Sequence, residues 1–263
     1  MVFQCLIDKK RVNSFKAAIS STVKAGDVVV DYGAGSGILS FFAADAGAKR
    51  VYAIEKDPAL YDLLKLSISS LNYSKIIIPI KDDALKVNLP EKADIIICEM
   101  IATGLFDELQ IPVMNNALKI AQSNCKIILS RIQNFVELVD VDSNFYGKKI
   151  KTIQYEYGWA KKPKVKKISE KKIYSEIDFS RINSGDIDTI IALNTKRSGK
   201  INAIKITNKT FFSDKSTLTS SPAYCMPIYI PIEQRSVRKG DKLSLHLKYK
   251  MCLGIANAHI QLL

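Results

Sequence analysis

The first 130 residues alternate short apolar runs with longer segments of helical periodicity. The apolar runs are rich in Val and Ile and cover residues 27–31, 50–55, 75–80, 93–98 and 125–130. Helices are expected between them, over residues 38–48, 57–72 and 112–122, and the second opens with an Asp followed by Pro, a good helix start. Strands that are apolar throughout and alternate with helices predict a parallel sheet covered on both faces, a doubly wound α/β domain.

After about residue 132 the pattern changes to short alternating or β-rich runs. These runs lie at residues 134–143, 149–159, 188–195, 202–208, 227–234 and 242–250. Turn signals such as "NSGD", "RSGK" and "KGD" separate them, and no long helical pattern survives. The sequence therefore predicts an α/β domain over residues 1–132 and an antiparallel β domain, barrel-like or a sandwich, over residues 133–263.

Composition places the chain among globular proteins. It has 263 residues, 47% of them hydrophobic, so a packed core is expected. No run approaches the roughly 20 apolar residues of a membrane span, and the N-terminus becomes charged too soon for a secretory signal. The five cysteines are far apart and form no CxxC pair, which favours neither disulfides nor a metal site. We expect a cytoplasmic protein that does not enter the membrane.

The net charge of +13 is unevenly distributed. After residue 135 the chain holds 23 of its 39 Lys and Arg residues but only 12 of its 26 acidic residues. The densest stretch is "KKPKVKKISEKK", from Lys161 to Lys172. It is typical of a solvated loop. The alternative is an electrostatic binding site for an acidic protein tail or for RNA.

A glycine-rich turn follows the first predicted strand. In "VVVDYGAGSGIL", Asp31 precedes Gly33, Gly35 and Gly37, so the backbone can turn sharply and approach a ligand closely. A dinucleotide fingerprint would require glycine where Ile38 stands. The acidic residue at the strand tip suits a ligand with an ammonium group, although a lone turn of this kind can be purely structural.

Two further acidic residues follow the next strands. Glu55 ends the second strand, where a carboxylate can accept both hydroxyls of a ribose. Asp83 follows the third strand and is placed to accept an adenine amino group, with Asp82 as the rival. Together with Asp31 these residues predict a pocket for an adenosine that carries an amino-acid tail, which is S-adenosylmethionine.

The stretch "EMIATGLFDE" follows the fourth predicted strand and carries two glutamates, Glu99 and Glu108, nine residues apart. They can be a strand-end charge and an acid that complements a helix N-terminus.

The stretch "VVVDYGAGSGILSFFAADAGAKRVYAIEKD" resembles the opening of the protein arginine methyltransferases, within the class I S-adenosylmethionine-dependent methyltransferases. The resemblance implies a Rossmann-like domain followed by a β barrel. It implies that Glu99 and Glu108 clamp a substrate guanidinium. It also places Arg11, in "DKKRVNSFKAAI", on the carboxylate of the cofactor.

The sequence departs from this family in two places. The family has a Thr-His-Trp stretch where this chain has "PAYCMP", so no histidine is present there and Tyr224 is the expected aromatic wall. The aromatic N-terminal helix that covers the cofactor in the family is missing or much shortened. Met100 is a possible counterpart of a methionine in the family's two-glutamate loop.

Three functions remain open on this basis. The first is an N-methyltransferase that modifies arginine-like or lysine side chains of proteins, by an in-line displacement that depends mainly on positioning. The second is an RNA methyltransferase recruited through Lys161–Lys172, although "CEMI" differs from the motif of enzymes that methylate exocyclic base amines. The third is a cofactor-binding scaffold without catalysis. The sequence indicates no oligomeric state.

Overall fold

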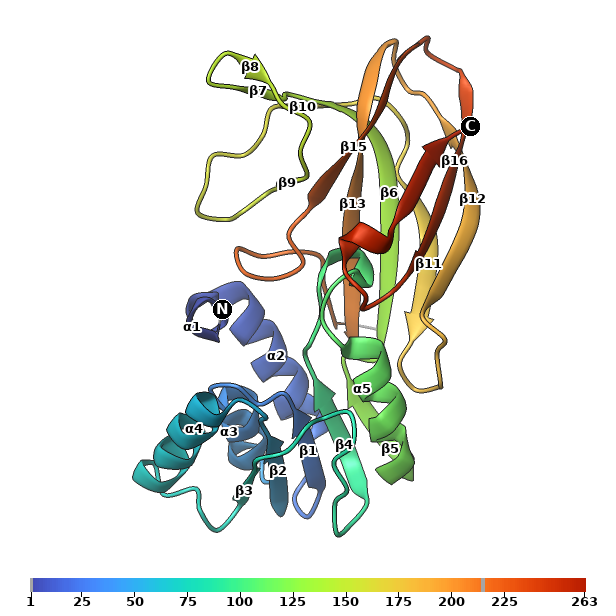
Figure 1. The fold of residues 1–263 in the computed structure, drawn as a ribbon. Coiled ribbons are helices and arrows are strands. Elements are labelled where there is room, and N and C mark those ends of the chain that lie inside the picture. The colour runs from blue at the N-terminus through green and yellow to red at the C-terminus, as the bar shows by residue number, and fades with distance from the viewer. Residues whose placement is uncertain (1, 214–215) are drawn as a thin grey trace.

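The computed structural model describes residues 2–213 and 216–263, and its first half is an α/β domain (Figure 1). Its five strands are all parallel and lie in the order β3-β2-β1-β4-β5. They are β1 (Val28–Tyr32), β2 (Arg50–Ile54), β3 (Ile77–Ile80), β4 (Ala93–Cys98) and β5 (Ala121–Ile128). The order reverses between β1 and β4, so the doubly wound prediction is confirmed and the ligand crevice lies at the carboxyl ends of these strands.

In the described residues, four helices pack against this sheet, and the short first helix packs on the second. The helices are α1 (Val2–Ile7), α2 (Lys9–Thr22), α3 (Ile38–Asp45), α4 (Pro58–Ser70) and α5 (Gln110–Ala117). Asp57 caps α4 as predicted, since its side chain accepts a hydrogen bond from the backbone N–H of Leu60 at 2.9 Å. The predicted helix over residues 112–122 was wrong at both ends. It begins at Gln110, and after the short 3₁₀ turn Leu118–Ile120 the chain enters β5, where Ala121 pairs with Ala93.

The second half consists of antiparallel strands, as predicted. One sheet has the order β10-β6-β13-β15-β9, with β11 also pairing with β6 and β14 with β13. Its strands are β6 (Arg131–Val141), β9 (Gln154–Tyr155), β10 (Val165–Lys167), β11 (Lys172–Asp178), β13 (Gly199–Ser213), β14 (Ser216–Leu218) and β15 (Ile228–Val237). A second sheet, in the order β12-β16-β17, holds β12 (Asp186–Asn194), β16 (Lys242–Lys250) and β17 (His259–Leu262). The hairpin of β7 (Asn144–Phe145) and β8 (Lys148–Lys149) projects from this barrel-like unit (Figure 1).

The segment between β8 and β11 differs from the sequence expectation. The run over residues 149–159 was predicted to be β-rich, yet it contains only the last residue of β8 and the two residues of β9. Conversely, the solvated-loop interpretation of Lys161–Lys172 is wrong for its middle. Val165–Lys167 pairs with β6, and Ile168 is completely buried. The apolar residues of this lysine-rich segment anchor it to the sheet, whereas its lysines stay at the surface.

The two halves share one hydrophobic core. Phe15 of α2 packs edge-on against Phe212 of β13, with ring centroids 4.8 Å apart. The change from parallel to antiparallel pairing falls between Ile128 and Arg131, which supports a boundary near the predicted 132/133, although the division into separate domains stays a prediction. In the part of the chain that the structure describes, no helix is long and apolar enough to cross a membrane.

Candidate functional site

A cavity of about 320 Å³ lies where the carboxyl ends of β1 and β4 meet α1, α2 and the segment before β15. It brings together six of the nine predicted site residues: Arg11, Asp31, Gly33, Gly35, Glu99 and Glu108. The barrel-like unit closes it from the other side with Tyr155, Ala223, Cys225 and Met226. The cavity therefore forms between the two halves of the chain and contains residues of both signs of charge.

The turn between β1 and α3 approaches the cavity with bare backbone. Gly33, Gly35 and Gly37 all have positive φ angles, which suit glycine. Gly37 does not line the cavity, but it shapes the turn as the N-cap of α3. A Cβ there would lie 2.4 Å from the side chain of Leu64, so no other residue fits without displacing that leucine.

Asp31 stands at the tip of β1, almost completely buried. One of its carboxylate oxygens accepts a hydrogen bond from the hydroxyl of Ser40 at 2.7 Å. Burial raises the pKa of Asp31 to about 6, and the bond from Ser40 opposes this rise. A cationic ligand group in the cavity would stabilise the ionised carboxylate and lower this pKa.

Glu55 and Asp83 do not line the cavity. Glu55 accepts hydrogen bonds from the backbone N–H groups of Gly35 at 2.9 Å and Asp57 at 2.8 Å. A carboxylate has about four acceptor sites, so Glu55 retains capacity for hydroxyl groups beside the glycine turn. Asp83 accepts from the backbone N–H of Leu85 at 3.0 Å and shapes its own loop. Their roles toward the cofactor stay predictions.

Arg11 and Glu99 form an ion pair in the wall of the cavity. Arg11 is 4% exposed, and it also donates from Nη1 to the carbonyl oxygen of Cys5 at 3.3 Å. Burial raises the pKa of Glu99, and the charge of Arg11 opposes this rise. The pair uses only the Oε2 atom of Glu99. Its Oε1 has no hydrogen-bond partner among the described residues.

Glu108 lines the same cavity but has no hydrogen-bond or ion-pair partner in the described part of the chain. It has a φ of 55°, a left-handed conformation that is uncommon for a residue with a side chain. Partial burial raises the pKa of Glu108 to about 7, and the negative charges of Glu99 and Asp107 add to the rise. Solvent still reaches Glu108, so a ligand can reach it as well.

The residues around this cavity fit the donor groups of S-adenosylmethionine. Arg11 keeps a buried Nε–H without a partner, which suits the carboxylate of an amino-acid tail. Asp31 lies on the same cavity and suits the ammonium of that tail. Gly33 and Gly35 leave room for a ligand to lie against the backbone.

Comparisons with known sequences agree with this chemistry. A family model, the TRM5/TYW2 methyltransferase domain, matches residues 7–111. The uncharacterised protein MJ1452 of Methanocaldococcus jannaschii is 34% identical over 252 residues, which cover 94% of this chain and 91% of the relative. A shorter match, 45% identical over 105 residues, joins 39% of this chain to 20% of the probable histone-arginine methyltransferase 1.3 of Arabidopsis thaliana.

Among solved structures, the fold is similar to that of the Trypanosoma brucei PRMT1 enzyme-prozyme heterotetrameric complex with AdoHcy. The TM-score is 0.81 at 18% sequence identity, and the match covers 99% of this chain and 91% of that chain. The chain is a class I S-adenosylmethionine-dependent methyltransferase. It belongs to the same family as MJ1452, and it has the two-part fold of the protein arginine methyltransferases.

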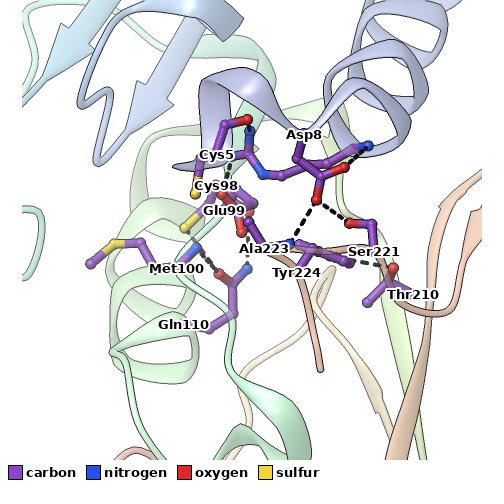
Figure 2. Close-up of polar contacts among 11 residues, drawn as sticks. Cys5, Asp8, Cys98, Glu99, Met100, Gln110, Thr210, Ser221, Ala223 and Tyr224 are labelled. Carbon is purple, nitrogen blue, oxygen red and sulfur yellow. Dashed lines mark hydrogen bonds and ion pairs between the residues drawn. The ribbon is translucent and has the colours of Figure 1, made fainter. Parts of the chain in front are cut away.

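The methyltransferase fixes the base of its two-glutamate loop with Gln110, a residue that the sequence analysis missed. Gln110 is fully buried at the start of α5. Its carbonyl oxygen accepts from the backbone N–H of Met100 at 2.9 Å, and its Nε2 donates to the carbonyl oxygen of Cys98 at 3.2 Å (Figure 2). These bonds hold the backbone on both sides of Glu99. A glutamine next to an apolar helical run was the only sequence signal.

The barrel-like unit of the methyltransferase holds the middle of this loop. The hydroxyl of Thr103 donates to the carbonyl oxygen of Met226 at 2.6 Å. The backbone N–H of Gly104 donates to the side chain of Asn208 at 3.1 Å, and its carbonyl accepts from the hydroxyl of Tyr249 at 2.8 Å. The middle of the loop between Glu99 and Glu108 is therefore held by residues more than 100 positions later in the chain.

The segment that lacks the family histidine is tied to the N-terminal side of the methyltransferase. Asp8 caps α2 through Arg11, and its other oxygen accepts from the hydroxyl of Ser221 at 2.6 Å and the N–H of Ala223 at 2.8 Å (Figure 2). The expectation that Tyr224 forms an aromatic wall was wrong. The buried ring of Tyr224 packs on Phe15, and the adjacent residues Ala223 and Cys225 line the cavity instead.

Proposed function

We propose that this methyltransferase transfers the methyl group to a guanidinium nitrogen of an arginine in a protein. The observation that carries the proposal is the pair of acidic side chains with unused acceptor atoms in one cavity. Glu108 has no partner among the described residues, and Glu99 offers its Oε1. Carboxylates in a crowded cavity are costly unless a cation joins them, and a guanidinium matches two carboxylates with paired N–H groups.

A lysine suits this cavity less well than an arginine. Two carboxylates near an ammonium would raise its pKa, and a protonated amine has no lone pair to attack with. A guanidinium stays charged with or without carboxylates beside it, since its pKa exceeds about 12. The carboxylates draw its positive charge toward the nitrogens they hold and leave the remaining nitrogen more nucleophilic.

The chain's own residues act mainly by positioning. S-adenosylmethionine supplies an electrophilic methyl group on a sulfonium. Arg11, Asp31 and the glycine turn hold the donor, while Glu99 and Glu108 hold the acceptor. As the new N–CH₃ bond forms and the S–CH₃ bond breaks, the nitrogen releases one proton. Glu108, which lines the same cavity, accepts this proton at its carboxylate, so the transfer does not need the absent histidine.

The similar proteins support a protein acceptor. One relative is named a probable histone-arginine methyltransferase, and one structural neighbour is a PRMT1 complex. The cytoplasmic location, the recruitment of RNA through Lys161–Lys172 and RNA itself as acceptor stay predictions from the sequence. The non-catalytic scaffold is set aside, because the chain is a methyltransferase.

A single experiment separates the acceptors. The enzyme is incubated with radiolabelled S-adenosylmethionine and a cell extract, and portions are then digested with protease or with ribonuclease. The proposal predicts protease-sensitive label that acid hydrolysis recovers as methylarginine. Recovery as methyllysine, or label removed by ribonuclease, would overturn it.

A further inference from the structure

Three aromatic side chains form a stack beside the active site. The rings of Tyr155 and Tyr157 lie 5.5 Å apart at an interplanar angle of 25°, and those of Tyr157 and Trp159 lie 5.2 Å apart at 24°. Trp159 is 58% exposed at the end of the stack. A large planar side chain that stacks on one side and faces solvent can accept another planar group.

The stack begins at the cavity itself. Tyr155 lines both the active-site cavity and a second hollow of about 480 Å³, to which Tyr157 also contributes. Gly158, between the second and third rings, lies against Pro222. The contact is so close that a Cβ at Gly158 would be 2.4 Å from the side chain of that proline. This contact anchors the stack beside Ala223 at the cavity wall. The rings therefore lead outward from the active site.

Lysines line the hollow beside the first two rings. The second hollow shares Asp142 and Lys164 with a third hollow of about 520 Å³. The two hollows are lined by six lysines: Lys149, Lys161, Lys162, Lys164, Lys166 and Lys200. Their acidic residues are Asp140 and Asp142, and Lys162 is paired with Glu156 at 2.8 Å. A strong positive excess remains along a surface that adjoins stacked rings.

We propose that this surface, which combines the three stacked rings with the lysine-lined hollows beside them, binds single-stranded nucleic acid. Bases stack on the exposed face of Trp159, and backbone phosphates lie along the lysines. An acidic peptide would use the lysines but has no planar group for the ring. An arginine-rich peptide could stack on the ring, but the lysines would repel it. Only a chain with both planar groups and repeated negative charge uses both features.

This binding site goes beyond the proposed function, because it needs neither the methyl donor nor the acceptor. It gives the enzyme a means to hold a protein acceptor that is itself bound to nucleic acid. It also assigns the charge excess of the second half to a defined surface, since lysines from β8, β10 and β13 contribute to it.

Trp159 is the only tryptophan of the chain, so its fluorescence reports directly on the stack. Labelled 12-residue RNA and DNA single strands are titrated with the full chain, and anisotropy and tryptophan quenching are followed at several salt concentrations. We expect quenching in parallel with binding. Trp159→Leu should weaken binding about tenfold, whereas Trp159→Phe should restore most of it. Comparing the affinities of the RNA and DNA strands shows whether the sugar contributes to binding.

A charge-matched pair of triple variants tests the lysines. Replacing Lys161, Lys164 and Lys166 by serine should lower the slope of log affinity against log salt by about 2. Serines at the surface residues Lys24, Lys75 and Lys119 of the α/β domain should leave the slope unchanged. An unchanged affinity in Trp159→Leu, or poly-glutamate that competes as well as RNA, overturns the proposal. Because no methyl transfer is measured, neither outcome depends on the identity of the acceptor.

Discussion

The acidic residues proposed to hold the methyl donor and those proposed to hold the acceptor differ in how many hydrogen bonds the protein itself makes to them. On the donor side, Asp31 accepts from Ser40, and Glu55 accepts from two backbone N–H groups. On the acceptor side, Glu99 has one bound oxygen and Glu108 has no partner among the described residues. The donor side is thus largely assembled before a ligand binds, while the acceptor side leaves carboxylates for a cation.

The two sides also depend on different parts of the chain. Apart from Arg11, the donor side is built within residues 31–57, by bonds between near neighbours. The acceptor side depends on contacts to Met226, Asn208 and Tyr249. Changes in the barrel-like unit should therefore affect acceptor methylation before they affect binding of the donor.

The largest effect is expected where the two sides meet, at the Arg11–Glu99 pair. Removing one member of a buried ion pair leaves an unpaired buried charge and costs about 3–5 kcal/mol of unfolding free energy. We expect this loss for Arg11→Ala in urea denaturation. The matched control is Arg50→Ala, which breaks the more exposed Arg50–Glu91 pair and should cost less than about 1 kcal/mol. Equal losses would contradict the account of a buried pair.

Asp31 tests the donor side directly. Removing its carboxylate deletes a charge-assisted contact to the ammonium of the donor, so Asp31→Ala should weaken S-adenosylmethionine binding about 100-fold in calorimetry. Ser40→Ala removes only a hydrogen bond to Asp31 and should weaken binding less than about tenfold. Undiminished binding by Asp31→Ala would end the assignment of this crevice.

Gln110 tests whether the acceptor side depends on its supporting bonds. Gln110→Ala frees the backbone on both sides of Glu99, so kcat for methyl transfer should fall about tenfold or more, because small misplacements are costly in positioning catalysis. The dissociation constant of the donor, measured by calorimetry, should stay nearly unchanged. An equal loss of donor binding would show that the two sides are not separable.

The pH profile gives the smallest and most specific effect. Glu108 has a pKa of about 7 and must be ionised to hold a guanidinium and to accept a proton. The value kcat/KM should therefore fall as pH drops through 7, by about tenfold per unit well below it. In Glu108→Gln the overall rate should be lower, and the acidic limb of the kcat/KM profile should disappear. A limb that persists in that variant belongs to another group.

The strand, turn and helix around Asp31 could be predicted from the sequence because their signals are local. Strand, turn and helix follow within the stretch around Asp31, and their spacing alone placed Gly33, Gly35 and Gly37. The doubly wound sheet was predictable for the same reason, since wholly apolar strands between helices have few other arrangements. The end of α5 was not, because pairing of Ala121 with Ala93 overrides its helical pattern.

The supporting residues of the acceptor side could not be predicted from the sequence alone. Gln110 and Asn208 act through bonds to the backbone, for which no residue pattern exists. The hydrogen bond from Ser221 to Asp8 joins residues 213 positions apart. Likewise, the stack from Tyr155 to Trp159 depends on a turn at Gly158 that packs against Pro222, and a β-rich pattern does not encode it.

The most direct test of the acceptor side is the rate of labelled methyl transfer to the arginine-containing protein found in the extract experiment. Glu99→Gln and Glu108→Gln should each lower this rate about 100-fold or more, because each removes a charge that holds the guanidinium. Asp62→Asn, the same change of charge on the exposed face of α4, should transfer at the wild-type rate. Full transfer by either glutamine variant would contradict the two-carboxylate clamp.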